Sequence, residues 1–246
     1  YKELKEELVE KGYQFNTNSD TEVLLYGYQE YQEDILNKLR GMFAFVIWDI
    51  NKKELFGARD YFGIKPFYYY KKDNIFMFAS EIKAFLDHSE FNKELNKDVI
   101  PEYLRFNYSP GTDTFFKNVY KLAPGHYFKL KDNKLDIRRY FTVSFDESDI
   151  IFDDLVDSIS KCMKDSVNHH MLSDVEVGSF LSSGIDSSYI VSLANPKKTY
   201  TVGYDIPKYN EIGYAEDLTT KLGITNISRK ISRDEYFEII PKIMYH

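Results

Sequence analysis

Apolar positions near the start of the chain repeat with helical spacing. Leu4, Leu8 and Val9 fall on one face of a helix. Ser19, with Glu22 three residues later, forms the capping-box pattern that begins another helix. The predicted elements of this region are a helix that ends at Gly12, a short strand over residues 13–15, a helix that begins at Ser19 and a short helix over residues 34–39.

Between residues 42 and 140 the pattern changes to short apolar runs separated by polar turns, which is typical of strands. The runs over 66–70 and 75–79 flank Lys72, Asp73 and Asn74 and are predicted to form a hairpin. The predicted strands cover residues 42–49, 54–58, 66–70, 75–79, 119–122, 126–130 and 135–140, with one helix over 98–106. Antiparallel strands with helices grouped beside them favour an α+β layer structure.

Helices and strands alternate in the second part of the chain. A polar, acidic stretch over residues 144–150 precedes it, and we place a domain boundary there, between residues 1–145 and 146–246. The predicted elements are a helix over 152–171, a strand over 175–181, a helix that stops by Asn195, a strand over 199–202, a helix over 211–222, a strand over 227–231 and a helix opened by a capping box of Ser232 and Glu235. This order implies a parallel sheet with right-handed crossovers. Ligands of such sheets bind beyond the carboxyl ends of the strands.

The stretch from Val175 to Val191 combines a strand, a tight loop and the start of a helix. Its first seven residues read as a strand in a covered sheet. Residues 182–184 break the period, and Asp186 and Ser187 are residue types that favour helix N-caps. A loop of this kind presents backbone N–H groups and a partial positive charge to an anion. The alternative is a core strand that runs into a capped helix and binds no ligand.

Side chains of the same loop suit phosphates and a metal ion. The candidate phosphate-binding residues are Ser182, Ser183, Gly184, Ser187 and Ser188. Asp186 lies where a carboxylate can hold a divalent metal that bridges phosphates. The loop differs from a Walker A loop, because the G-x-x-x-x-G-K-[ST] spacing and its lysine are absent.

The segment SSGIDSS resembles the SGGxDS pyrophosphate loop of the N-type ATP pyrophosphatases. That resemblance implies ATP and Mg²⁺ as ligands and cleavage of ATP between its α- and β-phosphates. Ser183 departs from the family pattern, which usually has glycine at this position. The substitution adds a Cβ near the phosphates, so it could alter affinity.

Four blocks of the first part, NSDTEVLLYGYQEY, LRGMFAFVIWD, ARDYFGIKPFYY and FASEIKAF, occur in this order. They resemble the glutaminase domain of glutamine-dependent asparagine synthetases, and four ordered blocks are far more specific than one short motif. The resemblance implies part of an α+β N-terminal-nucleophile sandwich over residues 1–145. It implies part of an α/β parallel-sheet domain of the ATP pyrophosphatase type over residues 146–246. It also implies that the N-terminus of the first domain and the C-terminus of the second lie outside this sequence.

The resemblance assigns roles to a few residues. Asp20 matches the acid that binds the α-ammonium group of glutamine, and a carboxylate at a helix N-terminus stays ionised and can pair with a cation. The alternative is that Asp20 only supports the cap begun at Ser19. Leu181 and Val202 match residues that contact adenosine, and Gly203 borders the same expected pocket. Ordinary strand core is the alternative for Leu181 and Val202.

No catalytic residue is assigned in this chain. The nucleophilic cysteine of the family precedes the first matching block, so this stretch alone is expected not to hydrolyse glutamine. Cys162 lies on the predicted apolar face of a helix and is expected to be a core thiol. The block from Arg59 to Lys65 is expected to be structural, as a charged loop with a tight turn at Gly63.

Composition limits the choice of partners. The net charge of −7 over 246 residues does not suggest a nucleic-acid partner. A single cysteine excludes an internal disulfide framework and fits a reducing compartment, so a cytoplasmic location is expected. No apolar run approaches the roughly 18 residues of a membrane span, and no signal peptide opens the chain. The oligomeric state stays open, with a homodimer as one option.

The resemblance implies ATP-dependent amidation of aspartate to asparagine with glutamine as nitrogen donor. The reaction would pass through β-aspartyl-AMP and release AMP and pyrophosphate. Two alternatives stay open: a related ligase that acts on another carboxylate, such as a β-lactam synthetase-like enzyme or a cell-envelope amidotransferase, and a non-catalytic remnant that binds ATP or glutamine.

Overall fold

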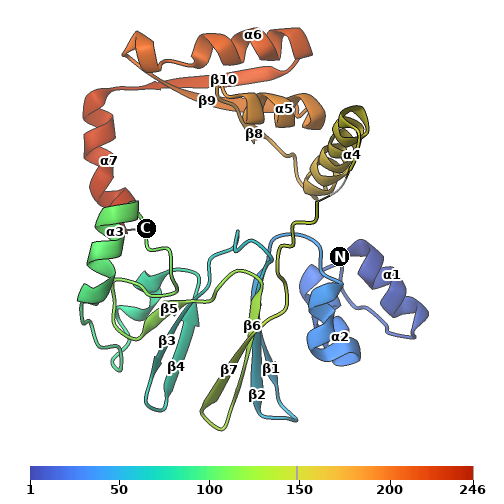
Figure 1. Cartoon of the computed structure of the whole chain (residues 1–246), viewed down its shortest axis with the longest axis vertical. Helices are drawn as coiled ribbons and strands as arrows, with labels where there is room; N and C mark the ends of the chain where they lie inside the picture. Colours follow the sequence, from blue (N-terminus) through green and yellow to red (C-terminus); the bar gives the residue numbers. More distant parts are fainter. Residues whose placement is uncertain (148, 246) are drawn as a thin grey trace. The chain divides into compact units, whose positions relative to one another are not determined.

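The computed structural model describes residues 1–147 and 149–245; Ser148, in the predicted boundary stretch, and His246 lie outside the described residues. The chain groups into two compact units, Tyr1–Phe145 and Asp146–His246. Figure 1 labels the elements of both units, and each unit is described below by itself.

Unit 1 contains two antiparallel sheets, with the strand orders β1–β2–β6–β7 and β4–β3–β5. The strands are β1 (Ala44–Asp49), β2 (Glu54–Arg59), β3 (Tyr68–Lys72), β4 (Ile75–Ala79), β5 (Val119–Lys121), β6 (His126–Lys131) and β7 (Lys134–Arg139). The helices are α1 (Lys2–Glu10), α2 (Asp20–Tyr31) and α3 (Ile100–Phe106), with 3₁₀ turns η1 (Gln32–Asn37), η2 (Ile82–Phe85) and η3 (Lys97–Val99). The strands predicted between residues 42 and 140 are confirmed, with ends that differ by at most two residues.

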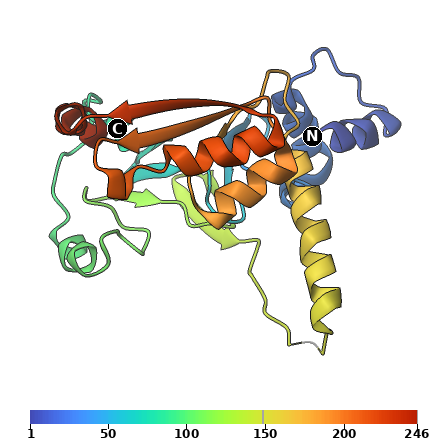
Figure 2. The same ribbon diagram turned by 90° about the horizontal axis from the view of Figure 1, so that it is seen from above.

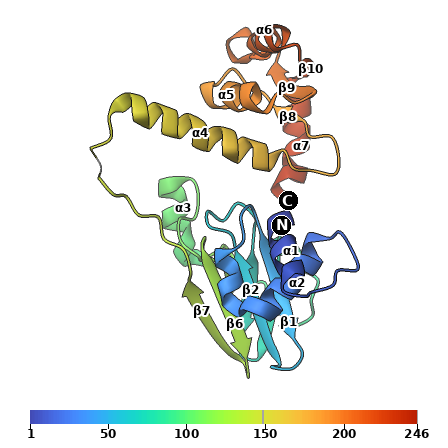
Figure 3. The same cartoon turned by 90° about the vertical axis from the view of Figure 1, so that its right-hand side faces the viewer.

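The first sheet is covered on both faces (Figures 1 and 3). Alternation along the strands sends Ile47 and Phe56 to one face, where they pack in a buried cluster with Leu8 and Val23 of α1 and α2. Phe128 of β6 faces the other way and packs with residues of the second sheet. The resulting order of layers is helices, sheet and sheet, which agrees with the predicted α+β class.

Two predictions for the start of unit 1 are wrong. Residues 13–15 form no strand, because the rings of Tyr13 and Phe15 pack against Tyr26 of α2, at centroid distances of 5.2 and 5.1 Å, instead of pairing with a neighbouring strand. The short helix predicted over 34–39 is the 3₁₀ turn η1. Both errors concern segments of a few residues, whose conformation tertiary packing decides.

Unit 2 contains a parallel sheet of order β10–β9–β8. Its elements are α4 (Phe152–His170), β8 (Ser179–Phe180), α5 (Ile185–Ala194), β9 (Lys198–Tyr204), η4 (Pro207–Tyr209), α6 (Ile212–Leu222), β10 (Thr225–Ile231) and α7 (Arg233–Tyr245). Leu181, Val191 of α5, Ala215 of α6 and Ile224 form one buried cluster, so α5 and α6 pack beside the strands (Figure 2). The predicted parallel order is confirmed, and so is the reciprocal capping box of Ser232 and Glu235.

The predicted strand over 175–181 is mostly wrong. Only Ser179 and Phe180 pair with β9, and the side chains of Val175 and Phe180 are 77% and 82% exposed. The apolar run predicted a covered strand, but β8 is an edge strand whose outer face no described element covers. Cys162 is exposed on α4 rather than a core thiol, because most of the apolar face of α4 is uncovered in the described unit.

Candidate functional site

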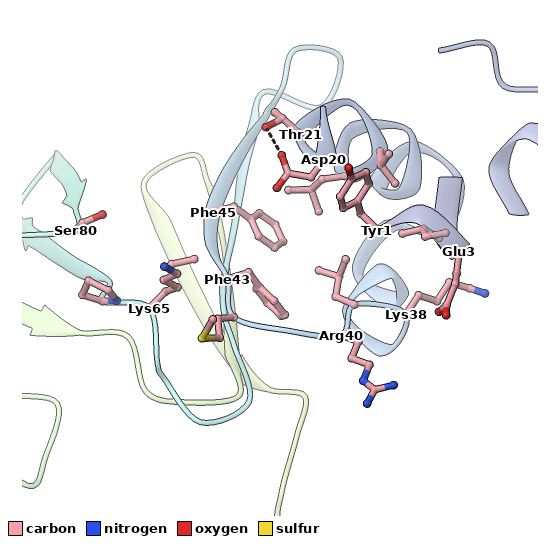
Figure 4. Close-up of a pocket in the computed structure, with 17 residues that line it drawn as sticks. Tyr1, Glu3, Asp20, Thr21, Lys38, Arg40, Phe43, Phe45, Lys65 and Ser80 are labelled. Carbon is pink, nitrogen blue, oxygen red and sulfur yellow. Dashed lines mark hydrogen bonds between the residues drawn. The ribbon is translucent and has the colours of Figure 1, made fainter. Parts of the chain in front are cut away.

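A cavity of about 460 Å³ opens in unit 1 between the helices and the edge of the first sheet (Figure 4). The rings of Phe43 and Phe45 lie along it, with their centroids 5.7 Å apart. Its charged and polar lining residues are Glu3, Asp20, Thr21, Lys38, Arg40, Lys65 and Ser80. Two carboxylates and three cations around an aromatic wall suit a small zwitterion such as an amino acid.

Asp20 is the first residue of α2, and local hydrogen bonds fix its position. Ser19 is the N-cap, and its hydroxyl accepts a bond from Thr21 N–H at 3.2 Å. The Glu22 carboxylate turns back to accept bonds from the backbone N–H groups of Asn16 and Thr17, at 2.9 and 2.7 Å. These bonds lower the pKa of Glu22. The predicted capping box is thus only half present, because Glu22 ties down the preceding loop rather than the N–H of Ser19.

A buried carboxylate, Asp60, holds together backbone segments that line the cavity. Asp60 is 1% exposed and accepts hydrogen bonds from four backbone N–H groups. They are Phe43 at 3.3 Å, Phe62 at 3.2 Å, Ile64 at 2.9 Å and Lys65 at 2.9 Å. Phe43 and Lys65 both line the cavity, so Asp60 holds two of its walls together. The structural role predicted for this block is supported by these contacts.

Arg59 braces the same loop from the opposite direction. Its guanidinium donates to the backbone carbonyls of Gly63, Lys65 and Leu122, each at 2.7 Å. Burial lowers the pKa of Arg59. Gly63 has φ +65°, a conformation that favours glycine, and an added Cβ would lie 2.9 Å from Pro124.

The loop after β8 in unit 2 is a compact hydroxyl cluster at a helix N-terminus. The Ser182 and Ser187 hydroxyls lie 2.8 Å apart, and the backbone N–H of Gly184 donates to the Ser182 hydroxyl at 3.2 Å. Gly184 is the N-cap of α5, and no side chain in the described part of the chain caps that helix. The N–H groups of the first turn are therefore left for water or a ligand. The predicted caps, Asp186 and Ser187, lie within the first turn instead, because the helix starts at Ile185.

Asp186 lies in the first turn of α5 and is exposed. Within residues 1–147 and 149–245, no group of three or more His, Cys, Asp and Glu side chains could hold a metal ion. A lone exposed carboxylate beside the candidate phosphate-binding loop fits Mg²⁺, which is usually bound by one or two carboxylates together with substrate phosphates and water. It does not fit a metal held by protein ligands alone.

Comparison with known proteins finds a family match in each of the two units. Residues 1–141 match the model of the glutamine amidotransferase domain, and residues 158–246 match that of asparagine synthase. Asparagine synthetase [glutamine-hydrolyzing] 1 of Bacillus subtilis is 45% identical over 251 residues, with 100% of this chain and 40% of the relative covered. The chain belongs to the glutamine-hydrolysing asparagine synthetase family.

Two further relatives share less of their sequence with this chain. Asparagine synthetase [glutamine-hydrolyzing] 3 of B. subtilis is 38% identical, over 82% of this chain and 35% of that relative. Asparagine synthetase [glutamine-hydrolyzing] 2 of the same organism is 34% identical, over 97% of this chain and 34% of that relative. The chain therefore spans less than half of the length of these asparagine synthetases. A solved structure of glutamine phosphoribosylpyrophosphate amidotransferase from B. subtilis, complexed with ADP and GMP, is also similar. The match covers 92% of this chain and 42% of the amidotransferase chain, at 20% sequence identity and a TM-score of 0.41.

The two residues that the asparagine synthetase resemblance assigns to adenosine occupy different environments. Leu181 is 3% exposed and packs in the cluster under α5 and α6. Val202 is 45% exposed on β9. Gly203 is buried, and an added Cβ would lie 2.3 Å from the side-chain oxygen of Asn210, so glycine lets the chain before α6 approach the strand closely. The exposed Val202 is the better placed of the two side chains to meet a ligand.

Two contacts of the loop after β8 were missed from the sequence. The Thr201 hydroxyl donates to the backbone carbonyl of Leu181 at 2.9 Å, and the Glu211 carboxylate accepts from Ser183 N–H at 3.2 Å. Both partners are more than 18 residues away in the sequence. The only available signal was topological, since the loops after two neighbouring parallel strands meet at one edge of the sheet.

The part of the chain that the structure describes contains no helix long and apolar enough to cross a bilayer.

Proposed function

We propose that this chain supplies a glutamine-binding site and an ATP-binding site to a glutamine-dependent asparagine synthetase. Residues 1–145 would form part of an N-terminal-nucleophile glutaminase domain, and residues 146–246 part of an ATP pyrophosphatase-type domain. The observation that carries the proposal is the uncapped, hydroxyl-lined N-terminus of α5 in the stretch that matches asparagine synthase. The cavity with Asp20 in the stretch that matches glutamine amidotransferases supports the other half.

In the proposed reaction, an oxygen of the aspartate side-chain carboxylate attacks the α-phosphorus of ATP. The bond between the α-phosphorus and the bridging oxygen breaks, which gives β-aspartyl-AMP and pyrophosphate. Ammonia, released from glutamine by hydrolysis to glutamate, then attacks the activated carbonyl and displaces AMP, which leaves asparagine. Each product follows from substrates of the proposed reaction, with no oxidant or reductant.

The proposed role of the phosphate loop is electrostatic. N–H groups of the first turn of α5 and the Ser182, Ser187 and Ser188 hydroxyls would donate to phosphate oxygens and stabilise charge on the departing pyrophosphate. Asp186 would hold Mg²⁺, which neutralises phosphate charge when bound. In unit 1, the Asp20 carboxylate would bind the α-ammonium group of glutamine. The nucleophile that attacks the glutamine amide is not assigned to any residue of this chain.

The test of the proposed function is ATP–pyrophosphate exchange by the full-length protein, with and without aspartate. Exchange that depends on aspartate would establish acyl-adenylate formation and the acceptor together. Exchange with another carboxylate only would keep the ATP site and change the acceptor. No exchange with any acid would favour a non-catalytic binding protein.

Replacement of Asp20 should separate the two nitrogen sources. In the full-length protein, we expect Asp20→Asn to raise the KM for glutamine by about 10-fold or more, since an ion pair with the substrate ammonium is lost. Asparagine synthesis from added ammonia should stay near normal. Asp34→Asn, an exposed acid outside the cavity lining, is the matched control. Equal loss with glutamine and ammonia would show that Asp20 supports the fold instead.

A further inference from the structure

The Glu211 carboxylate reaches out of its own segment to the phosphate loop. Glu211 is the N-cap residue of α6, yet its side chain makes no capping bond to that helix. Asn210 caps the helix instead, since its side-chain oxygen accepts a hydrogen bond from Ile212 N–H at 3.3 Å. Glu211 instead accepts the Ser183 N–H at 3.2 Å, across 28 residues of sequence. A carboxylate therefore lies on a backbone donor of the loop that is proposed to bind phosphate.

The packing of unit 2 brings Glu211 to this position. Gly203 lets the segment of Asn210 and Ile212 approach β9 within a distance that leaves no room for a Cβ. The loop after β8 is tied to β9 by Leu181, whose N–H donates to the Tyr200 carbonyl at 2.9 Å. The two loops are consequently neighbours at the carboxyl edge of the sheet. Glu211 is half-buried, which limits the directions available to its side chain.

A carboxylate and a phosphate oxygen are alternative partners for one N–H group. The backbone donors on either side of Ser183 have partners inside the loop, because Ser182 N–H donates to the Ser187 hydroxyl and Gly184 N–H to the Ser182 hydroxyl. Ser183 N–H is thus a donor whose partner comes from outside the loop. A triphosphate placed there would meet a carboxylate of the same sign, and like charges at short range oppose binding.

We propose that Glu211 is a positioning residue that tunes the phosphate affinity of this loop: its carboxylate holds the Ser183 N–H until a polyphosphate replaces it. The proposal rests on the proposed function, in which unit 2 binds ATP. The carboxylate keeps the loop in its binding conformation when no nucleotide is present, and its charge weakens the binding of any anion at the same donor. The affinity of the site is therefore set below the maximum that its N–H groups and hydroxyls allow.

The test compares Glu211→Gln with the unmodified full-length protein in equilibrium binding of ATP, inorganic pyrophosphate and adenosine. Glutamine keeps an oxygen that can accept the Ser183 N–H but removes the charge. We expect the Kd for ATP and for pyrophosphate to fall by roughly 5- to 10-fold at low salt. The gain should shrink as salt is added, and the Kd for adenosine should not change. Glu216→Gln, an exposed acid on the same helix, is the matched control and should leave all three Kd values unchanged.

Each other result contradicts the proposal. Unchanged or weaker pyrophosphate binding by Glu211→Gln would mean that its charge does not oppose the anion. An equal gain for adenosine, or the same gain in Glu216→Gln, would mean a general change in structure or net charge. If the unmodified protein binds neither ATP nor pyrophosphate, the proposed function itself fails, and this result is distinct from a failure of the Glu211 variant alone.

Discussion

Asp186→Asn in the full-length protein should lower ATP–pyrophosphate exchange by about 100-fold or more, the usual effect of removing one electrostatic contact to a transition state. The substitution keeps the size of the side chain and removes the charge that would hold Mg²⁺. Asp186 is exposed in the first turn of α5, so its loss there should cost the helix only a few tenths of a kcal/mol. Exchange should fall while the melting temperature stays the same.

Two further measurements make this prediction specific. Hydrolysis of glutamine by the Asp186→Asn protein should continue, because Asp20 and its cavity belong to unit 1. Asp217→Asn, an exposed acid on α6, should leave exchange unchanged. Normal exchange by the Asp186 variant would contradict the assignment of this carboxylate to the metal and phosphates.

Asp186 also illustrates what the sequence could predict. The apolar periodicity and the stop at Asn195 located the helix, and the order of strands and helices predicted the parallel sheet, which the structure confirms. These features depend on local pattern and on chain topology. The start of α5 was misjudged by two or three residues, since Gly184 rather than Asp186 or Ser187 caps it. Small residues in a tight loop offer several alternative caps, and local pattern does not distinguish between them.

The wrong predictions share a physical cause. An apolar run predicts that a segment will be covered but does not identify what covers it. Phe180 on β8 and Cys162 on α4 are both exposed in the described unit, although their patterns predicted burial. Contacts between residues far apart in the sequence could not be predicted from local pattern either. Nothing in the local pattern around Glu211 indicates a bond to Ser183, and nothing around Asp60 indicates that Phe43 donates to it.

Asp60→Asn should strongly destabilise unit 1. The two carboxylate oxygens of Asp60 each accept two backbone N–H groups, and the amide NH₂ of asparagine cannot accept any. Two part-buried donors would lose their partners, at about 1–3 kcal/mol each. A loss of ~3 kcal/mol corresponds to a fall of roughly 6–12 °C in the unfolding transition of a domain of this size. Amide hydrogen exchange should accelerate at Phe62 and Ile64, or at Phe43 and Lys65, according to which oxygen the NH₂ group replaces.

The Asp60→Asn substitution should also weaken glutamine binding in the cavity, because it loosens two residues of the cavity wall. Asp60 joins Phe43 to the loop that contains Lys65, and both residues line the cavity beside Asp20. We expect the KM for glutamine to rise while synthesis from ammonia by the surviving folded protein is spared. Asp87→Asn, an exposed acid of the same unit, controls for the lost charge and should change neither the unfolding transition nor the KM. A destabilised variant with an unchanged KM would show that the walls of the cavity do not need this carboxylate, and that Asp60 serves stability alone.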